Sequence, residues 1–170
     1  MHAKTLAHQL GISSYVLERN LSELSDQESL TAPEKGGNCL NWVLGHLVRS
    51  RLMALQGLGQ EAPFPLEDFN AYDDRGGVPF GRETALPLAE LKRRFKATQE
   101  PLVRGLAGMS PETMAKPAPF SPTGDPNETM GSLLVAFTFH EAYHVGQTGL
   151  LRRVVGKKGM ITPAPAAAAT

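Results

Sequence analysis

Residues 133–154 read LLVAFTFHEAYHVGQTGLLRRV, and this stretch has the clearest helical pattern in the chain. Steps of three or four residues separate the members of one stripe along it: Leu133, Phe137, His140, His144, Gln147, Leu151 and Val154. Residues at such steps share one face of an α-helix, so we expect this face to point inward at a single partner surface. Upstream, Asp125 is the expected N-cap with Pro126 at the first helical position, and Gly156 is the expected end.

Three further segments show helical periodicity, and no segment shows the alternation of a β-strand. They cover about residues 5–24, 39–56 and 87–106, so the sequence predicts an all-α protein folded as a four-helix bundle. The linker 57–86 is rich in Gly and Pro but carries four aromatic residues, and a structureless loop of that length is unusual. We expect a long packed crossover there. It would make helices two and three parallel and the bundle up-down-down-up.

Composition excludes several classes of protein. The 170 residues carry 17 basic and 17 acidic side chains, and this zero net charge argues against nucleic-acid binding. No stretch approaches the roughly 20 apolar residues of a membrane helix, so no membrane association is expected. The single cysteine, Cys39, fits a reducing cytosol, and we expect a cytoplasmic location. We expect one bundle over residues 1–156 and a flexible C-terminal tail over 157–170.

Three of the five histidines are the candidate ligands of a divalent metal ion. His140 and His144 are spaced i, i+4, so both imidazoles lie on the inward face of one helix and can reach one divalent ion. Taken alone, the pair fits two interpretations equally well: a pair of metal ligands, or two core histidines that have hydrogen-bond partners. His46, on the second helix, would complete a face of three nitrogens with positions left open for water and substrate. His2 and His8 are expected at the surface.

His140-Glu-Ala-Tyr-His144 also matches H-E-x-x-H, the zinc-protease signature in which the glutamate is the general base. In those families the third ligand lies downstream. After Glu141 the chain contains no Asp or Glu, and after His144 it contains no His. The expected strands are missing from the pattern too, so the sequence disfavours a protease.

Two motifs occur in order along the chain. One is Asn41-Trp42-Val43-Leu44-Gly45-His46-Leu47, and the other is His140-Glu-Ala-Tyr-His144-Val-Gly-Gln147 followed by Leu151-Arg152. In these motifs the sequence resembles the DinB family, also called the DinB/YfiT-like metalloenzymes. The similarity covers about residues 5–156.

This resemblance implies a four-helix bundle that holds a divalent metal, zinc or nickel, through His46, His140 and His144. Family members commonly form homodimers, and characterised branches include transferases and isomerases that use low-molecular-weight thiols. The implied function is thiol S-transfer or hydrolysis acting on a small molecule. The alternative is a non-catalytic, stress-related module that binds metal or ligand and acts as a dimer. The family name does not imply DNA binding.

Other polar residues are weaker candidates. Glu141, one residue off the inward stripe, would either be an acidic residue that flanks the metal, with general base as its catalytic role, or be solvated. Gln147, one turn after His144, would orient a ligand or make a packing hydrogen bond. Cys39, about two turns before His46, is expected to be a small core residue.

Charged groups elsewhere are expected to be solvated. The basic groups are Lys92-Arg93-Arg94, Lys96 and Arg152-Arg153, and their alternative role is to receive an anionic cosubstrate. The acidic residues of the crossover, Asp68, Asp73 and Asp74, are not expected to bind metal.

Overall fold

The structure is a computed structural model that describes residues 3–73 and 78–160. Four long helices lie side by side in it: α1 (Ala3–Asn20), α3 (Leu40–Gly57), α4 (Leu88–Ala107) and α6 (Met130–Val154). Short helical segments lie in the connections: α2 (Asp26–Ser29), the 3-10 helix η1 (Leu66–Tyr72) and α5 (Pro111–Met114). Apart from one isolated bridge, the described residues contain no β-structure, so the prediction of an all-α fold is confirmed.

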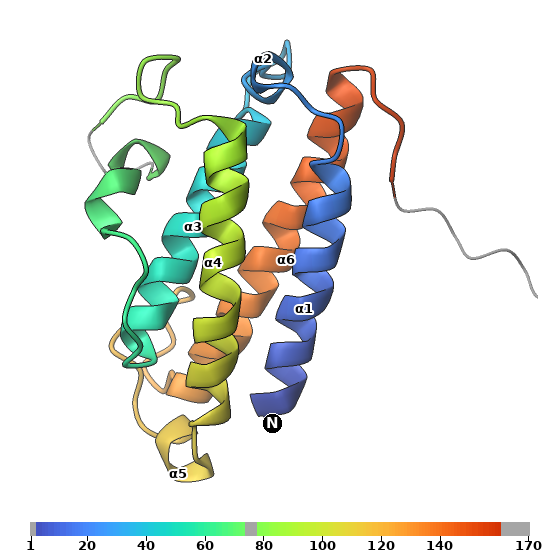
Figure 1. The fold of residues 1–170 in the computed structure, drawn as a ribbon. Coiled ribbons are helices and arrows are strands. Elements are labelled where there is room, and N and C mark those ends of the chain that lie inside the picture. The colour runs from blue at the N-terminus through green and yellow to red at the C-terminus, as the bar shows by residue number, and fades with distance from the viewer. Residues whose placement is uncertain (1–2, 74–77, 161–170) are drawn as a thin grey trace, which may run out of the picture.

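Figure 1 shows the direction in which the chain runs through each long helix. The chain rises through α1, descends through α3, descends again through α4 and rises through α6. Helix α3 packs against both α4 and α6, and α1 packs against the same two helices. Helix η1 packs against α3 within the connection that leads to α4. The end of η1 therefore lies next to His46 on α3.

Leucines account for most of the core. The predicted stripe on the first helical segment is buried throughout, at Leu6, Leu10, Leu17, Leu21 and Leu24. On α4 the predicted apolar residues are buried as well: Leu88, Leu91, Phe95, Leu102 and Leu106. Burying one such side chain is worth about 1.5–3 kcal/mol, so these two stripes fix how α1 and α4 face the core.

The start of α6 differs from the prediction. Its N-cap is Thr129, whose side chain accepts from the Ser132 N–H in a capping box, and not Asp125. Residues 116–118 pair with residues 128–130 through backbone hydrogen bonds that include Met130 N–H to Lys116 O. This pairing keeps the backbone extended up to Thr129, so the helix cannot begin earlier.

The inward face of α6 also differs from the prediction. The buried residues are Leu134, Thr138, Glu141, Val145, Thr148, Leu151 and Arg152, and only Leu151 belongs to the predicted stripe. Helix α6 contacts α1 and α3 together, so its most buried line points between them. His140 and His144 belong to the predicted stripe, are half-buried, and have their rings against that of His46 on α3. Half-buried side chains such as these keep access to solvent.

Some predicted features lie outside the described residues. Of the predicted tail, only residues 157–160 are described, and His2 and Asp74 also fall outside. The division into a bundle and a flexible tail stays a prediction. Within the described residues, no helix combines the length and the apolar character that crossing a membrane requires.

Candidate metal centre

The motif on α3 places one ligand-bearing side chain among structural ones. Leu44 and Leu47 are fully buried in the core, whereas His46 is only half-buried. The Trp42 ring stacks on the His46 ring, with centroids 4.8 Å apart and planes within 9°. This stacking restricts the rotation of the imidazole.

Gly45 is required by the approach of η1. A Cβ atom at position 45 would lie 2.1 Å from Cδ1 of Tyr72, a distance that real Cβ atoms do not tolerate. Without a side chain there, the Tyr72 ring lies directly on the α3 backbone. This contact brings the Tyr72 carbonyl oxygen to 3.0 Å from His46 Nδ1. A glycine next to the histidine therefore permits the hydrogen bond that orients it.

The hydroxyl at the tip of the Tyr72 side chain also helps to hold η1 in place. It donates to Asn41 Oδ1 at 3.1 Å and accepts from the Leu86 N–H at 2.7 Å. The Asn41 amide in turn donates to Leu86 O at 2.9 Å. Burial raises the pKa of Tyr72 to about 12, so the hydroxyl stays protonated and the network stays intact. Asn41 of the motif thus acts as a structural residue.

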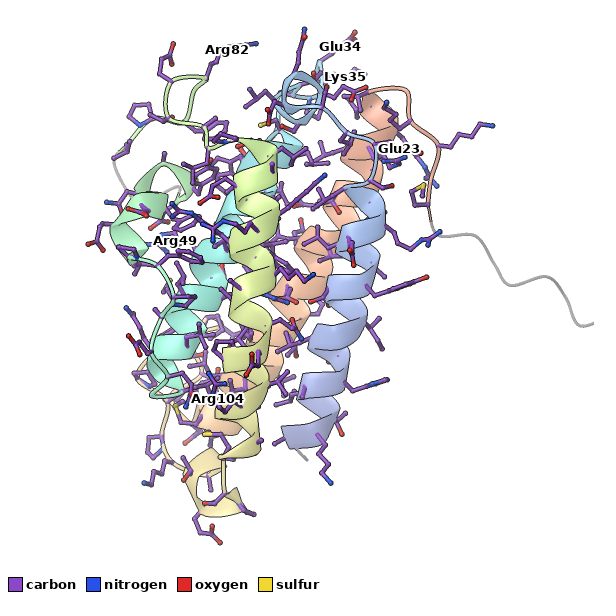
Figure 2. The ribbon with its side chains drawn as sticks, in the orientation of Figure 1. Glu23, Glu34, Lys35, Arg49, Arg82 and Arg104 are labelled. Atoms are coloured by element: carbon purple, nitrogen blue, oxygen red, sulfur yellow. The ribbon has the colours of Figure 1, made fainter. Side chains whose placement is uncertain are left out.

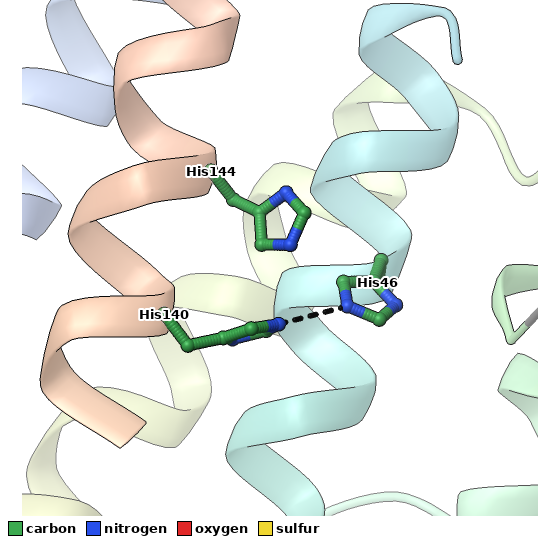
Figure 3. Close-up of side chains that lie close together, drawn as sticks. All are labelled: His46, His140 and His144. Atoms are coloured by element: carbon green, nitrogen blue, oxygen red, sulfur yellow. Dashed lines mark hydrogen bonds between the residues drawn. The ribbon is translucent and has the colours of Figure 1, made fainter. Parts of the chain in front are cut away.

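The three predicted histidines come together in the seam between α3 and α6. One ligand atom from each of His46, His140 and His144 lies within 4.8 Å of the others. His46 Nε2 lies 3.1 Å from His140 Nε2 (Figure 3). The ring centroids of His140 and His144 are 4.5 Å apart, and the angle between the ring planes is 70°. Two helices therefore supply one compact cluster of imidazoles.

Hydrogen bonds at Nδ1 of His46 and of His144 determine which ring nitrogen of each residue carries the lone pair. The Tyr72 carbonyl can only accept, so His46 Nδ1 carries a proton and donates to it. His144 Nδ1 donates to Gln147 Oε1 at 2.7 Å in the same way. In each neutral ring the lone pair then lies on Nε2. Such partners orient the ligands in many metal sites.

These residues fit a divalent cation. Zinc binds histidine nitrogens at about 2.0–2.1 Å, which places two nitrogens of a tetrahedral site about 3.4 Å apart. The 3.1 Å between His46 Nε2 and His140 Nε2 is close to that spacing. Three neutral imidazoles suit zinc and nickel, and three protein ligands leave a coordination position open.

Protonation of His140 is unfavourable. Burial and the neighbouring His144 and His46 lower the pKa of His140 to about 4. His140 therefore keeps its lone pair available to a metal ion near neutral pH.

A pH dependence of stability follows for the metal-free protein. Unfolded chains protonate histidine below about pH 6.5, whereas His140 in the folded protein does so only near pH 4. The stability contributed by neutral His140 is present above pH 6.5 and is lost as the pH falls toward 4. Denaturant titrations at several pH values should show that His140→Gln reduces this slope and that His8→Gln, on an exposed part of α1, does not. Equal slopes in all three proteins would assign the titration to other groups.

Glu141 is not solvated, which corrects that alternative of the expectation. Its carboxylate is fully buried and accepts from Arg51 Nε at 2.6 Å and from Arg51 Nη2 at 2.7 Å. Arg51 also donates to the Thr98 hydroxyl and lies 3.6 Å over the Phe95 ring. Both carboxylate oxygens are occupied, so the glutamate of the H-E-x-x-H pattern is held as a structural ion pair.

Cys39 lies at the start of α3. It is buried, as expected of a core residue, and burial raises the pKa of its thiol. Together with Trp42, Asp73 and Phe80 it lines a cavity of about 690 Å³. The histidines do not line this cavity, but Trp42, whose ring stacks on that of His46, does. The cavity is therefore a neighbouring space and not the cluster itself.

Most other charged candidates are paired. Asp68 accepts from Arg94 at 2.7 Å, and Asp73 pairs with Arg49 at 2.7 Å. Arg152 is buried and donates to the Asn20 and Ser22 carbonyl oxygens, so the expectation of a solvated face is wrong for this residue. Arg153, Lys96 and His8 are exposed as expected.

Sequence reasoning missed three residues at or near the cluster. The Tyr72 carbonyl gives no signal in a sequence, because any residue could supply it. Arg51 did give a signal: Leu40, Leu44, Leu47, Arg51 and Leu55 follow one another at helical steps, and all are buried. An arginine on such a stripe requires a buried acid. Arg49, on the same helix, is the third.

Taken together, these features define an all-helical protein with a three-histidine cluster between two of its long helices. A family model described as the DinB superfamily matches residues 10–148, so the chain belongs to the DinB superfamily. One solved structure, the crystal structure of the conserved protein of locus from Enterococcus faecalis, matches with a TM-score of 0.73 at 19% identity. The match covers 92% of this chain and 99% of that chain, and at this identity it shows a shared fold alone. No curated protein matches the chain.

Proposed function

We propose that the chain is an up-down-down-up four-helix bundle that binds one divalent metal ion, zinc or nickel, through His46, His140 and His144. One observation carries the proposal: ligand atoms of these three residues lie within 4.8 Å of one another. The hydrogen bonds from His46 to Tyr72 and from His144 to Gln147 support it, because they direct lone pairs toward the centre.

We further propose that the protein is an enzyme acting on a small molecule, by thiol S-transfer or by hydrolysis. A bound divalent ion favours the deprotonated form of a thiol or of water, which generates a nucleophile near neutral pH. Gln147 would orient His144, and Trp42 would hold the plane of His46. Glu141 is not the proposed base, because Arg51 occupies both of its oxygens.

A homodimer in the cytoplasm completes the proposal. Helix α6 exposes Phe139, Tyr143 and Leu150, which are 68%, 57% and 63% accessible. A second copy of the chain would cover such a surface. The free, buried thiol of Cys39 is compatible with a reducing compartment.

Metal content tests the proposal directly. Natively purified protein should carry about one divalent ion per chain by inductively coupled plasma mass spectrometry. His144→Ala should weaken zinc or nickel binding by more than about 100-fold in calorimetry, because even the loss of an outer partner costs about 10–100-fold. His8→Ala is the matched control, since His8 is exposed on α1.

Two results would contradict the proposal. A wild-type protein that holds no divalent ion and takes up none would exclude the metal centre. Full metal retention in His144→Ala would exclude the ligand assignment. A panel of low-molecular-weight thiols with electrophiles then addresses the reaction.

A further inference from the structure

We propose that Arg49 is an anion-binding arm beside the candidate metal centre, so that the ligand carries a carboxylate a few bonds from its metal-binding atom. This inference rests on the proposed function and names the class of ligand. Arg49 lies three residues after His46, which places both on the same face of α3. Figure 2 shows Arg49 between α3 and the segment that carries η1.

Consecutive residues at the end of η1 hold the two side chains. The Tyr72 carbonyl accepts from His46 Nδ1 at 3.0 Å, and the Asp73 carboxylate accepts from Arg49 Nη2 at 2.7 Å. The Arg49 and Asp73 side chains are 17% and 19% exposed. The guanidinium is therefore positioned together with the imidazole, by the same short piece of chain.

Arg49 has hydrogen-bonding capacity to spare. Its Nη2 pairs with Asp73, and its Nη1 donates to the Met53 sulfur, which is a weak acceptor. Its Nε is buried and has no partner, and it is the only such side-chain nitrogen or oxygen within residues 3–73 and 78–160. A buried donor without an acceptor costs free energy. A carboxylate that engages the guanidinium fork would satisfy it.

The charges around the centre favour an anion. Asp73 offsets Arg49, and Arg51 offsets Glu141 within the core. Three neutral histidines leave the charge of a bound divalent ion uncompensated. An anionic ligand would supply the missing negative charge.

The adjacent cavity offers room for the body of such a ligand. Its volume of about 690 Å³ falls within the range of small-molecule sites. Trp42, which stacks on His46, and Asp73, which holds Arg49, both line it. The cavity is thus lined by one residue that contacts His46 and by one that contacts Arg49.

A matched pair of thiols tests the inference. Cobalt-loaded protein would be titrated with 3-mercaptopropionate and with 3-mercaptopropanol, and binding would be followed by thiolate-to-cobalt absorption and calorimetry. We expect wild type to bind the carboxylate thiol about tenfold more tightly, as a charge-assisted hydrogen bond would give. Arg49→Gln should abolish this preference while neutral-thiol binding stays unchanged, and Arg49→Lys should keep part of it.

Two further variants separate anion binding from a structural brace between α3 and η1. Asp73→Asn removes the competing carboxylate, so the preference for 3-mercaptopropionate should increase. Arg104→Gln, at an exposed pair with Glu100 on α4, makes the same charge change at a remote site and should alter nothing. A mere brace would instead make Arg49→Gln and Asp73→Asn weaken both thiols alike.

The outcomes distinguish this inference from the proposed function. If wild type takes up no metal, both are overturned. If it binds metal but shows no preference for the carboxylate, or if Arg49→Gln retains the preference, the anion-binding role alone is overturned.

Discussion

Glu141→Ala is expected to lower the free energy of unfolding by about 3–5 kcal/mol, because it leaves the Arg51 guanidinium buried without its counter-charge. The two side chains are 1% and 0% exposed, so water cannot take the place of the carboxylate. For a chain of this size the loss corresponds to a fall in melting temperature of about 10 °C or more. Thermal and denaturant unfolding of metal-free protein would measure it.

Arg51 makes this pair a junction of all four long helices. From α3 it donates to Glu141 on α6, to Ser14 on α1 and to Thr98 on α4. Removing one partner therefore loosens α6 against the helix that carries His46. We expect Glu141→Ala to weaken zinc binding as well, although Glu141 is not among the proposed ligands.

Controls separate charge burial from simple truncation. Glu100→Ala removes a glutamate whose side chain is 86% exposed beside Arg104 and should cost less than about 1 kcal/mol. The double variant Arg51→Met with Glu141→Leu replaces both charges by apolar groups and should recover much of the lost stability. Ser14 and Thr98 keep other partners in that variant, Gln99 and the Phe95 carbonyl oxygen. A loss in Glu141→Ala no larger than in Glu100→Ala would contradict the argument.

This ion pair shows where the sequence was sufficient and where it was not. The leucine stripes of α1 and α4 predicted the buried faces of those helices, because apolar and polar residues separate cleanly there. On α6 they do not separate: Phe139 and Leu150 are exposed while Glu141 and Arg152 are buried. Apolar spacing alone therefore placed the inward face one residue away from its true position.

The histidines were easier to predict than their surroundings. An i, i+4 pair and a third histidine on another apolar helix constrain one another, since a buried imidazole requires a partner. Their hydrogen-bond partners were only partly predictable. Gln147 lies one turn from His144 on the same helix and was a local inference. The Tyr72 carbonyl reaches His46 from a separate segment, through a contact that depends on tertiary packing.

Gly45→Ala is expected to destabilise the protein by about 1–2 kcal/mol and to weaken metal binding. Alanine normally stabilises a helix interior by about 1 kcal/mol relative to glycine. Here its Cβ would lie 2.1 Å from the Tyr72 ring, and overpacking of a core costs about 1–3 kcal/mol or more. Relief requires η1 to move away from α3, which would take the Tyr72 carbonyl from His46. Denaturant unfolding and zinc calorimetry would measure the two effects.

Gly11→Ala provides a control of opposite sign. Gly11 lies within α1 with nothing within 4 Å of the position of a Cβ, so alanine should stabilise the protein by up to about 1 kcal/mol and leave zinc affinity unchanged. In a Tyr72→Ala background the clash is gone, and Gly45→Ala should then be neutral or stabilising. This change of sign would show that the effect is a coupling between the two positions. If Gly45→Ala costs the same with and without the Tyr72 ring, the close approach of η1 is not the reason for a glycine beside His46.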